Sequence, residues 1–367
     1  MWETMSNGIT YLISQSYTSL FLMFWIVLIL EIPRYLLSFF TSVFFLKTRA
    51  DFDQDINSLG RVSVVIPGHD EAETIASCAA SLQEQSYPPD EVIIVSDGSL
   101  DNTRNKIKKL QKNSHFYYAH ATDLRGGRAS AMNLGERFST GEFIIALDPD
   151  SSLDRHAIKH IMQDFEDPKV GAVSGNIFIR NDTTNILTTF QAIEYLVSIS
   201  LGKHALSMLD QVTCSSGAFS AFRNTALQEV GGFDAGGGED LDITLRLRNY
   251  GWKIAFAQEA ICLSDCPTDI PALTRQRFRW ERDAIRLRYR KYLQFINPFK
   301  NRVNLKEFFH QFEFLLFNVI AALALPIYLI WLFMRYGTNA WFILVGAQVI
   351  LIIMDTITFT LVPCIQL

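Results

Sequence analysis

The chain has 367 residues, which is enough for about two ordinary domains. Charged residues make up 19% of it, against about 25% in soluble domains, while 49% are apolar and 28 are Phe. This composition excludes a disordered protein, a coiled coil and a small disulfide scaffold. The net charge of −5 gives no sign of a nucleic-acid binder, and five scattered cysteines favour a reducing compartment over a disulfide framework.

The N-terminal segment, residues 1–50, has the composition of a membrane anchor. No charged residue separates Glu3 from Glu31, and residues 19–30 are almost wholly apolar. A bilayer-crossing helix needs about 20 mostly apolar residues, and this stretch lacks the basic start and cleavage site of a signal peptide. We therefore expect a membrane span. Arg34, Lys47 and Arg49 follow it, so the positive-inside rule places the next region in the cytoplasm.

Residues 51–274 have the pattern of an α/β domain. Short β-branched runs at 62–67, 91–95, 116–120, 143–148 and 170–174 alternate with helical patterns near 71–85, 101–111, 128–138 and 154–165. Such alternation predicts βαβ units and a mostly parallel sheet, with ligands at the carboxyl ends of the strands.

The C-terminal third turns basic and then apolar. Residues 275–308 mix Arg and Lys with apolar side chains, which predicts amphipathic helices on an anionic membrane surface. Residues 309–367 contain uncharged stretches at 314–334 and 340–354 around a short turn. We expect transmembrane helices there, giving about three spans in the chain.

Two acidic motifs follow predicted strands. Asp97-Gly98-Ser99 stands where an acidic residue can contact a nucleoside, although an ordinary turn is favoured when the motif is taken alone, and Ser99 can equally be a helix cap. In Asp148-Pro149-Asp150 two carboxylates flank a stiff proline, a pattern suited to a hard divalent cation. A solvated acidic turn is the alternative.

Two further motifs lie downstream. Glu239-Asp240 follows three glycines and begins a helical pattern. Capping that helix needs only one of these acids, so the pair is also a candidate general base. Gln276, Arg279 and Trp280 are spaced to share one face of a helix. Arg279 suits a diphosphate, and Trp280 offers a flat platform for a sugar ring.

In order and spacing these four motifs resemble the membrane-bound family 2 glycosyltransferases, which include cellulose, poly-N-acetylglucosamine, chitin and hyaluronan synthases. The resemblance runs from about Arg61 to Arg282. It implies an α/β GT-A fold, with a Rossmann-like, mostly parallel sheet in a cytosolic domain flanked by transmembrane and interfacial helices. Asp70 stands where the family usually has Asn, and Ser96 where it often has Asp.

The resemblance also implies roles for individual residues. The nucleotide-binding residues would be Pro67, Glu71, Asp97, Arg128 and Asp148. Asp148 and Asp150 would hold Mg²⁺ or Mn²⁺. The catalytic pair would be Glu239 and Asp240, with Asp240 as the base. Contacts to the acceptor and the diphosphate would come from Ser216, Gly217, Gln276, Arg279 and Trp280.

The implied function is inverting transfer from a UDP-sugar to a growing polysaccharide by a multi-pass protein of the cell (inner) membrane, with its catalytic domain in the cytoplasm. A membrane lipid is the alternative acceptor. About three spans are few for a sugar channel. The channel would then be completed by additional membrane subunits, by a homo-oligomer or by further C-terminal sequence, unless the acceptor is a lipid. Nucleic acid is not an expected partner. A glycoside hydrolase and a non-catalytic membrane scaffold are the competing classes. A glycoside hydrolase needs neither a nucleotide-binding loop nor a pair of metal-binding carboxylates.

Overall fold

The computed structural model describes residues 2–33, 36, 60–114, 116–295 and 305–366. The chain divides into two compact units. One contains Met1–Thr48 and Leu293–Leu367, and the other contains Arg49–Tyr292. Each unit is described by itself.

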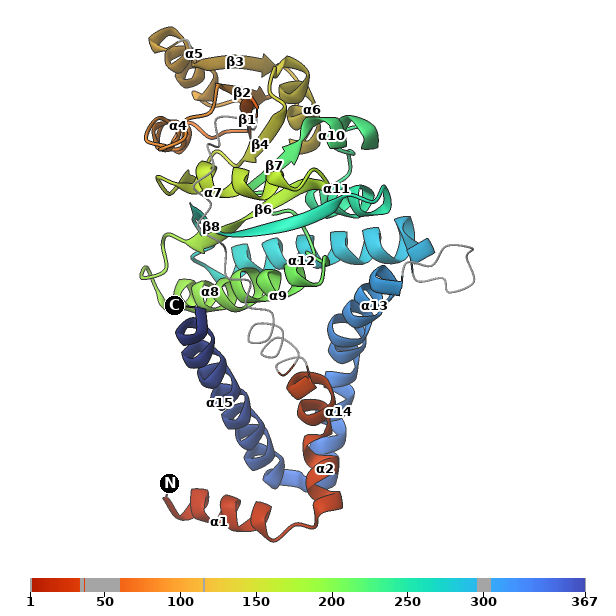
Figure 1. The fold of residues 1–367 in the computed structure, drawn as a ribbon. Coiled ribbons are helices and arrows are strands. Elements are labelled where there is room, and N and C mark those ends of the chain that lie inside the picture. The colour runs from red at the N-terminus through yellow and green to blue at the C-terminus, as the bar shows by residue number, and fades with distance from the viewer. Residues whose placement is uncertain (1, 34–35, 37–59, 115, 296–304, 367) are drawn as a thin grey trace. The chain divides into compact units, whose positions relative to one another are not determined.

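The Arg49–Tyr292 unit is built on one eight-stranded sheet with the order β3-β2-β1-β4-β7-β6-β8-β5 (Figure 1). Its strands are β1 (Val62–Gly68), β2 (Glu91–Asp97), β3 (Tyr117–Thr122), β4 (Phe143–Leu147), β5 (Ser152–Leu153), β6 (Val170–Ile179), β7 (Phe219–Arg223) and β8 (Lys253–Ser264). The pairs among β1 to β4 are parallel, as is β6 with β8. Strand β7 is antiparallel to both of its neighbours, and β5 is antiparallel to β8. The sheet is therefore mixed.

The predicted strands and helices of this unit are confirmed with small shifts of their ends. The helices that follow the first strands are α4 (Ile75–Gln83), α5 (Thr103–Asn113), α6 (Arg128–Phe138) and α7 (Ala157–Gln163). The short helix η3 (Asp164–Glu166) continues α7. The sequence analysis did not predict β5, β7 or β8, nor the antiparallel direction of β7.

Seven more helical segments complete the described part of the unit. A continuous helical stretch comprises α8 (Ile186–Tyr195), the π-helical η4 (Leu196–Leu201) and α9 (Gly202–Met208). Helices α10 (Asn224–Val230) and α11 (Glu239–Asn249) flank β7 and β8 in sequence. Helix α12 (Ile270–Arg286) continues into the π-helical η5 (Leu287–Lys291).

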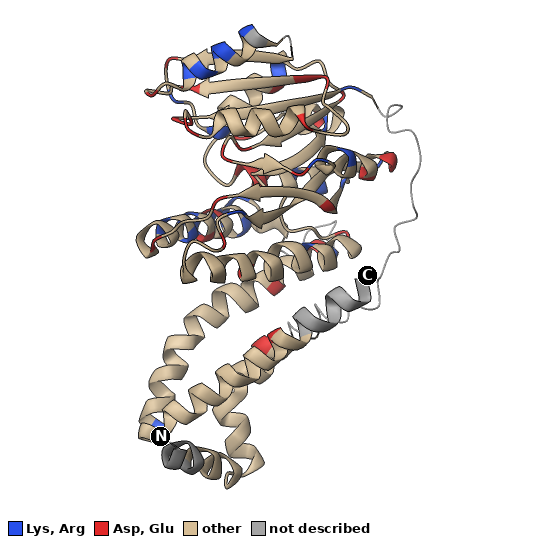
Figure 2. Ribbon diagram, turned by 90° about the vertical axis from the view of Figure 1, so that its left-hand side faces the viewer, with Lys and Arg blue, Asp and Glu red and all other residues tan. Residues whose placement is uncertain are grey.

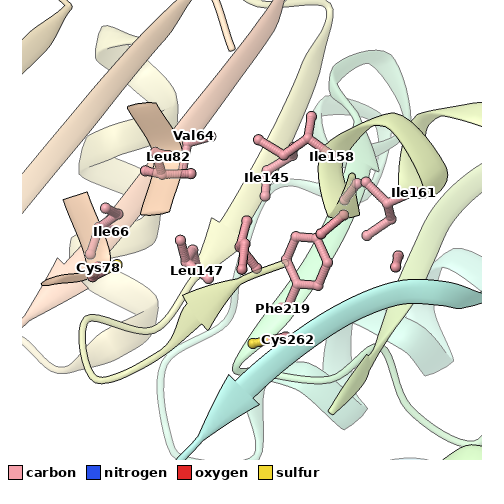
Figure 3. Packing of buried hydrophobic residues seen from close by; sticks show 14 of the residues in the cluster. Val64, Ile66, Cys78, Leu82, Ile145, Leu147, Ile158, Ile161, Phe219 and Cys262 are labelled. Atoms are coloured by element: carbon pink, nitrogen blue, oxygen red, sulfur yellow. The ribbon is translucent and has the colours of Figure 1, made fainter. Parts of the chain in front are cut away.

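Apolar side chains alternate along the strands and supply a core on each face of the sheet. Val64, Ile66, Ile145 and Leu147 face the side covered by α4 and α7, where they pack with Leu82, Cys78, Ile158 and Ile161 (Figure 3). Val65, Ile93 and Ile144 face the other side, which is covered by α6, α10 and α11. Because β1, β2 and β4 are buried on both faces, the sequence has continuous apolar runs there.

The described part of the other unit is helical and poor in charged residues. It contains α1 (Trp2–Ile13), α2 (Tyr17–Ile26) continued by η1 (Val27–Glu31), η6 (Leu293–Phe295), α13 (Leu305–Phe314) with η7 (Leu315–Ile320), α14 (Ala321–Tyr336), η8 (Gly337–Asn339) and α15 (Ala340–Gln366). Met23, Leu30, Leu332 and Ile343 form part of its small core. Figure 2 shows Lys, Arg, Asp and Glu concentrated on the sheet unit, with few on α14 and α15.

One helical run among the described residues, Leu305–Ile357, is long and apolar enough to cross a membrane. The apolar helix Tyr17–Glu31 is shorter than that test requires. Part of the predicted N-terminal segment, including Lys47 and Arg49, lies outside the described residues. The expectation of about three spans therefore stays a prediction.

Candidate functional site

A cleft of about 280 Å³ opens at the carboxyl ends of β1, β2 and β4, the edge where ligands bind in sheets of this kind. Its lining combines three of the four sequence motifs. The lining residues are Pro67, Gly68, His69, Glu71, Asp97, Arg125, Gly127, Arg128, Ala131, Asp148, Pro149, Asp150 and Arg279.

A larger groove of about 570 Å³ lies beside η5, but its charged side chains bind one another and the nearby backbone. Lys291 Nζ is 2.5 Å from both Asp234 Oδ2 and Asp242 Oδ1, so these charges satisfy one another. Arg286 donates to the carbonyl oxygens of Gly236 and Gly237. None of the predicted site residues lines this groove, so we assign the functional site to the smaller cleft.

Asp97 is buried at the end of β2 and binds the loop that precedes α6. Its two carboxylate oxygens accept hydrogen bonds from the backbone N–H groups of Gly126 and Gly127, at 2.8 and 2.7 Å. Gly98 has φ +63° and lies so close to this loop that a Cβ there would be 2.5 Å from the Arg125 nitrogen. Only glycine fits that approach. The Asp97 motif thus fixes one wall of the cleft.

The loop after β1 forms the adjoining wall. His69 donates from Nδ1 to the Asp97 carbonyl oxygen at 2.8 Å. Asp70 has φ +59°, and its Oδ1 accepts from the Leu100 N–H at 2.7 Å. This contact ties the β1 and β2 loops together. Asp and Asn both tolerate that backbone conformation, so Asp70 can replace the Asn usual in the resembling family without distorting the loop.

Asp148 and Asp150 lie on the short turn between β4 and β5. The Asp148 N–H donates to the Ala218 carbonyl oxygen at 3.0 Å, and Arg180 Nη2 donates to the Asp150 carbonyl oxygen at 2.9 Å. Burial, then the charges of Asp148 and Glu71, raises the pKa of the Asp150 carboxyl to about 6. Burial also raises the pKa of Glu71, with the charge of Asp148 acting in the same direction. Asp148, Asp150 and Glu71 are therefore close enough to repel one another.

Arg128 connects the two acidic motifs across the cleft. Its Nε is 3.0 Å from Asp148 Oδ1, its Nη1 is 3.2 Å from Glu239 Oε1, and its Nη2 donates to the Gly217 carbonyl oxygen. Burial alone would lower the pKa of this guanidinium, but the charges of Asp148, Glu239 and Asp240 outweigh burial and raise that pKa. The sequence analysis predicted a diphosphate contact for Arg128, and the structure also shows it bridging both acidic motifs.

The Glu239-Asp240 pair begins α11. The three preceding glycines have φ of +127°, +82° and +65°, a backbone path that residues with a Cβ rarely adopt. Asp240 Oδ2 lies 3.6 Å from the position that a Cβ on Gly217 would take, and Arg128 Nη2 lies 3.8 Å from the same point. The predicted base and the predicted acceptor segment Ser216-Gly217 are thus neighbours.

The three motif residues of α12, Gln276, Arg279 and Trp280, do not all lie in the cleft. Arg279 lines the cleft, whereas Gln276 and Trp280 do not. Trp280 is 39% exposed and lies 4.5 Å from the Arg277 guanidinium, measured from its ring centroid. Its ring centroid is 6.5 Å from that of Tyr195. Trp280 therefore lies outside the cleft lining and is partly exposed to solvent.

Four residues of this region were not assigned by the sequence analysis. His69 and Arg125 line the cleft, Arg180 holds the backbone of the Asp150 turn, and Lys203 is buried against Ser216. Only Lys203 leaves a signal in the sequence, since it is a charged residue within the otherwise uncharged stretch 195–203. Three-dimensional contacts were needed for the others.

Comparison with known proteins places this arrangement in context. Residues 60–282 match the family described as glycosyltransferase-like family 2. The poly-β-1,6-N-acetyl-D-glucosamine synthase of Staphylococcus epidermidis is 34% identical over 221 residues, 60% of this chain and 53% of that protein. The enzyme of the same name from Staphylococcus aureus (strain COL) is 32% identical over 230 residues, 62% of this chain and 55% of that one. The chain spans about half the length of the curated relatives it matches.

A solved structure shares the fold. The mannosyltransferase PcManGT from Pyrobaculum calidifontis, determined with GDP-Man and Mn²⁺, superposes with a TM-score of 0.67 at 20% identity. The match covers 91% of this chain and 92% of that one. The expected GT-A fold is confirmed for the mixed α/β sheet domain.

Proposed function

The chain belongs to glycosyltransferase-like family 2, and from that premise we propose that it transfers a sugar, with inversion, from a UDP-sugar to a growing polysaccharide. The observation that carries the proposal is the single cleft lined by Asp97, Arg128, Asp148, Asp150 and Arg279. That cleft offers a nucleoside wall, a pair of carboxylates for a cation and two guanidinium groups for a diphosphate. Glycoside hydrolysis needs none of these three features.

In this proposal Asp240 accepts the proton of the acceptor hydroxyl as its oxygen attacks the anomeric carbon. General base catalysis of this kind contributes about 10²–10⁴-fold. Arg128 and Arg279 supply fixed positive charge where the leaving diphosphate gains negative charge. Trp280 stacks on the acceptor sugar beside the cleft. Glu239, held by Arg128 at 3.2 Å, orients the first turn of α11.

The carboxylates of the β4–β5 turn fit a divalent cation. Asp150 is half-buried, and its pKa is raised first by burial and then by the negative charges of Asp148 and Glu71. Within the described residues no three acidic, His or Cys side chains converge as a complete ligand set. Mg²⁺ commonly uses one or two protein carboxylates and takes its other ligands from substrate phosphates and water. Asp148 and Asp150 would hold Mg²⁺ or Mn²⁺, which supplies charge neutralisation for a departing diphosphate.

The relatives favour a polymer as the acceptor. Two synthases that make poly-β-1,6-N-acetyl-D-glucosamine are 34% and 32% identical to this chain, so N-acetylglucosamine is the first donor sugar to test. A lipid acceptor is the second candidate, because one run of helix among the described residues, Leu305–Ile357, meets the length for a span and a sugar channel needs several. A cytoplasmic catalytic domain on the cell membrane is consistent with either acceptor.

The test uses the full chain purified in detergent, with radiolabelled UDP-N-acetylglucosamine, UDP-glucose or GDP-mannose and with Mg²⁺, Mn²⁺ or EDTA. We expect cation-dependent transfer from a UDP-sugar into material retained on a gel; solvent-extractable label identifies a lipid acceptor instead. Asp240→Asn should keep UDP binding and lose at least about 100-fold in transfer. Asp123→Asn, at a side chain that is 94% exposed, is the matched control. Turnover near that of the wild type in Asp240→Asn contradicts the assignment of the base, and glycoside hydrolysis without nucleotide contradicts the proposed reaction.

A further inference from the structure

Lys203 on α9 is a buried cation next to the proposed site. Its side chain belongs to a residue that is 8% exposed. Nζ donates to Ser174 Oγ at 3.1 Å and also to Ser216 Oγ. Within the described residues its hydrogen-bond acceptors are thus serine hydroxyls and not carboxylates. Helix α9 does not need a charged side chain at position 203 for its own stability.

Burying this ammonium is costly, so the position calls for a physical reason. Burial lowers the pKa of Lys203, while the nearby Cys214 and Asp240 side chains act in the opposite direction. Lys203 is therefore within electrostatic reach of Asp240. It does not line the donor cleft, so any effect on transfer must act through the residues between them.

Ser216 is the first of those residues. Its N–H donates to Ser174 Oγ at 3.1 Å, and its carbonyl oxygen accepts from Ser220 Oγ at 2.6 Å. The carbonyl oxygen of the next residue, Gly217, accepts from Arg128. A shift of Ser216 would therefore move a hydrogen-bond partner of Arg128.

The preceding residue carries the connection to the base. The Ser215 N–H donates to Thr244 Oγ1 at 2.8 Å, and that hydroxyl donates to the Asp240 carbonyl oxygen at 2.7 Å. The segment Ser215–Gly217 thus links Lys203 to the first turn of α11 on one side and to Arg128 on the other. This chain of contacts joins Asp240, which acts on the acceptor hydroxyl in the proposed transfer, to Arg128, which acts on the donor diphosphate.

We propose that Lys203 is a positioning residue, whose ammonium holds Ser215–Gly217 so that Asp240 and Arg128 face the reacting groups from fixed positions. The inference rests on the proposed function, since positioning has meaning only for a transferring enzyme. The expected effect falls mainly on turnover: Arg128 is the one donor-side residue in this chain of contacts, and Asp97, His69 and the Asp148 turn make no contact with Lys203. Misplacing a catalytic group by about 1 Å can cost about 100-fold in rate.

The test compares Lys203→Met with Lys253→Met in the full chain. Methionine keeps much of the length of the lysine side chain and removes the charge. Lys253 is the matched control because it is a surface lysine, 43% exposed, that pairs with Asp167 on the same unit. We expect Lys203→Met to lower kcat by about 10–100-fold while the Kd for the UDP-sugar, measured by calorimetry, stays within about twofold. Lys253→Met should leave both unchanged.

Ser216→Ala keeps the inference testable if Lys203→Met does not fold. That variant removes the hydroxyl which accepts from Lys203, and we expect the same separation of kcat from donor Kd. If both single variants fold, their losses in kcat should be less than multiplicative in the double variant, because they break one connection. A normal kcat in either folded single variant, or a donor Kd that weakens in parallel with kcat, overturns the role of Lys203. A wild-type protein that transfers no sugar from any nucleotide donor overturns the proposed function itself.

Discussion

Asp150 offers a test of the cleft that does not depend on knowing the substrate. Burial, with the charges of Asp148 and Glu71, raises its pKa from 3.8 to about 6. The folded protein therefore holds a proton on Asp150 at pH values where the unfolded chain has released it. Between about pH 4 and pH 6, stability must fall as the pH rises, since the folded state binds more protons there. Above about pH 6 Asp150 is ionised, and its charge lowers the free energy of unfolding by the full amount.

The size of that cost follows from the displacement of the pKa. A change of this size corresponds to at most about 3 kcal/mol. Because Asp150 retains some contact with solvent, screening reduces the figure to about 2 kcal/mol. Replacing Asp150 with Asn removes the charge and nearly preserves the shape. We therefore expect Asp150→Asn to be more stable than the wild type at pH 7.5 without divalent cations, by about 2 kcal/mol or about 4–8 °C in Tm.

The measurement is thermal unfolding of the full chain in detergent and EDTA, between pH 4 and pH 8. The advantage of Asp150→Asn should vanish near pH 4, where both proteins are neutral at this site. Glu71, whose pKa is also raised, titrates in both proteins, so their difference reports the Asp150 charge together with its repulsion from Glu71. Mg²⁺ or Mn²⁺ should stabilise the wild type and not the variant, and Asp123→Asn should change stability by less than about 0.5 kcal/mol. A variant that is equally or less stable than the wild type at pH 7.5, or a difference independent of pH, would refute the reasoning.

Two further predictions concern residues that hold the cleft together. Arg128→Gln should lower the free energy of unfolding by about 2 kcal/mol, because Asp148 and Glu239 lose a charged hydrogen-bond donor. Their side chains are 31% and 15% exposed. An unchanged denaturation midpoint would show that the Arg128 bridge contributes nothing to stability. Gly98→Ala should lower Tm by at least about 4 °C, because the new Cβ would lie 2.5 Å from backbone. Gly251→Ala is its control, with φ +93° and nothing within 4 Å of the new Cβ; equal losses in the two variants would mean that the close approach at Gly98 does not matter.

The sheet was predictable where burial leaves a local signature. The runs at β1, β2 and β4 are buried on both faces, so β-branched residues are continuous there and the sequence identifies them. Strand β7 (Phe219–Arg223) is five residues long and contains Ser and Arg, which gives no such run. Its antiparallel direction follows from its place between β4 and β6, which is a tertiary fact. The mixed character of the sheet therefore could not be derived from periodicity.

The site was predictable as a set of residue types but not as a network. Asp97, Asp148 and Arg279 were identified by their motifs, and the structure brings them to one cleft. The bridge from Arg128 to Glu239 joins residues 111 positions apart, and no local pattern encodes such a contact. Lys203 is a single charge in an uncharged stretch, but its serine partners are distant in sequence and cannot be identified from that signal. The roles of these residues in transfer remain predictions for the assays above.

The short pairing of β5 with β8 has a consequence for how the protein is made. Asp148 and Asp150 leave the ribosome flanked by β4 on one side only, because Ser152 and Leu153 pair with residues of β8 that are synthesised about 110 residues later. At about 5–20 residues per second, that interval lasts about 5–20 s. Until then the acidic turn is anchored at one end and has no fixed geometry. Substitutions that destabilise β8 are therefore expected to disturb the acidic turn, although they lie about 110 residues away in sequence.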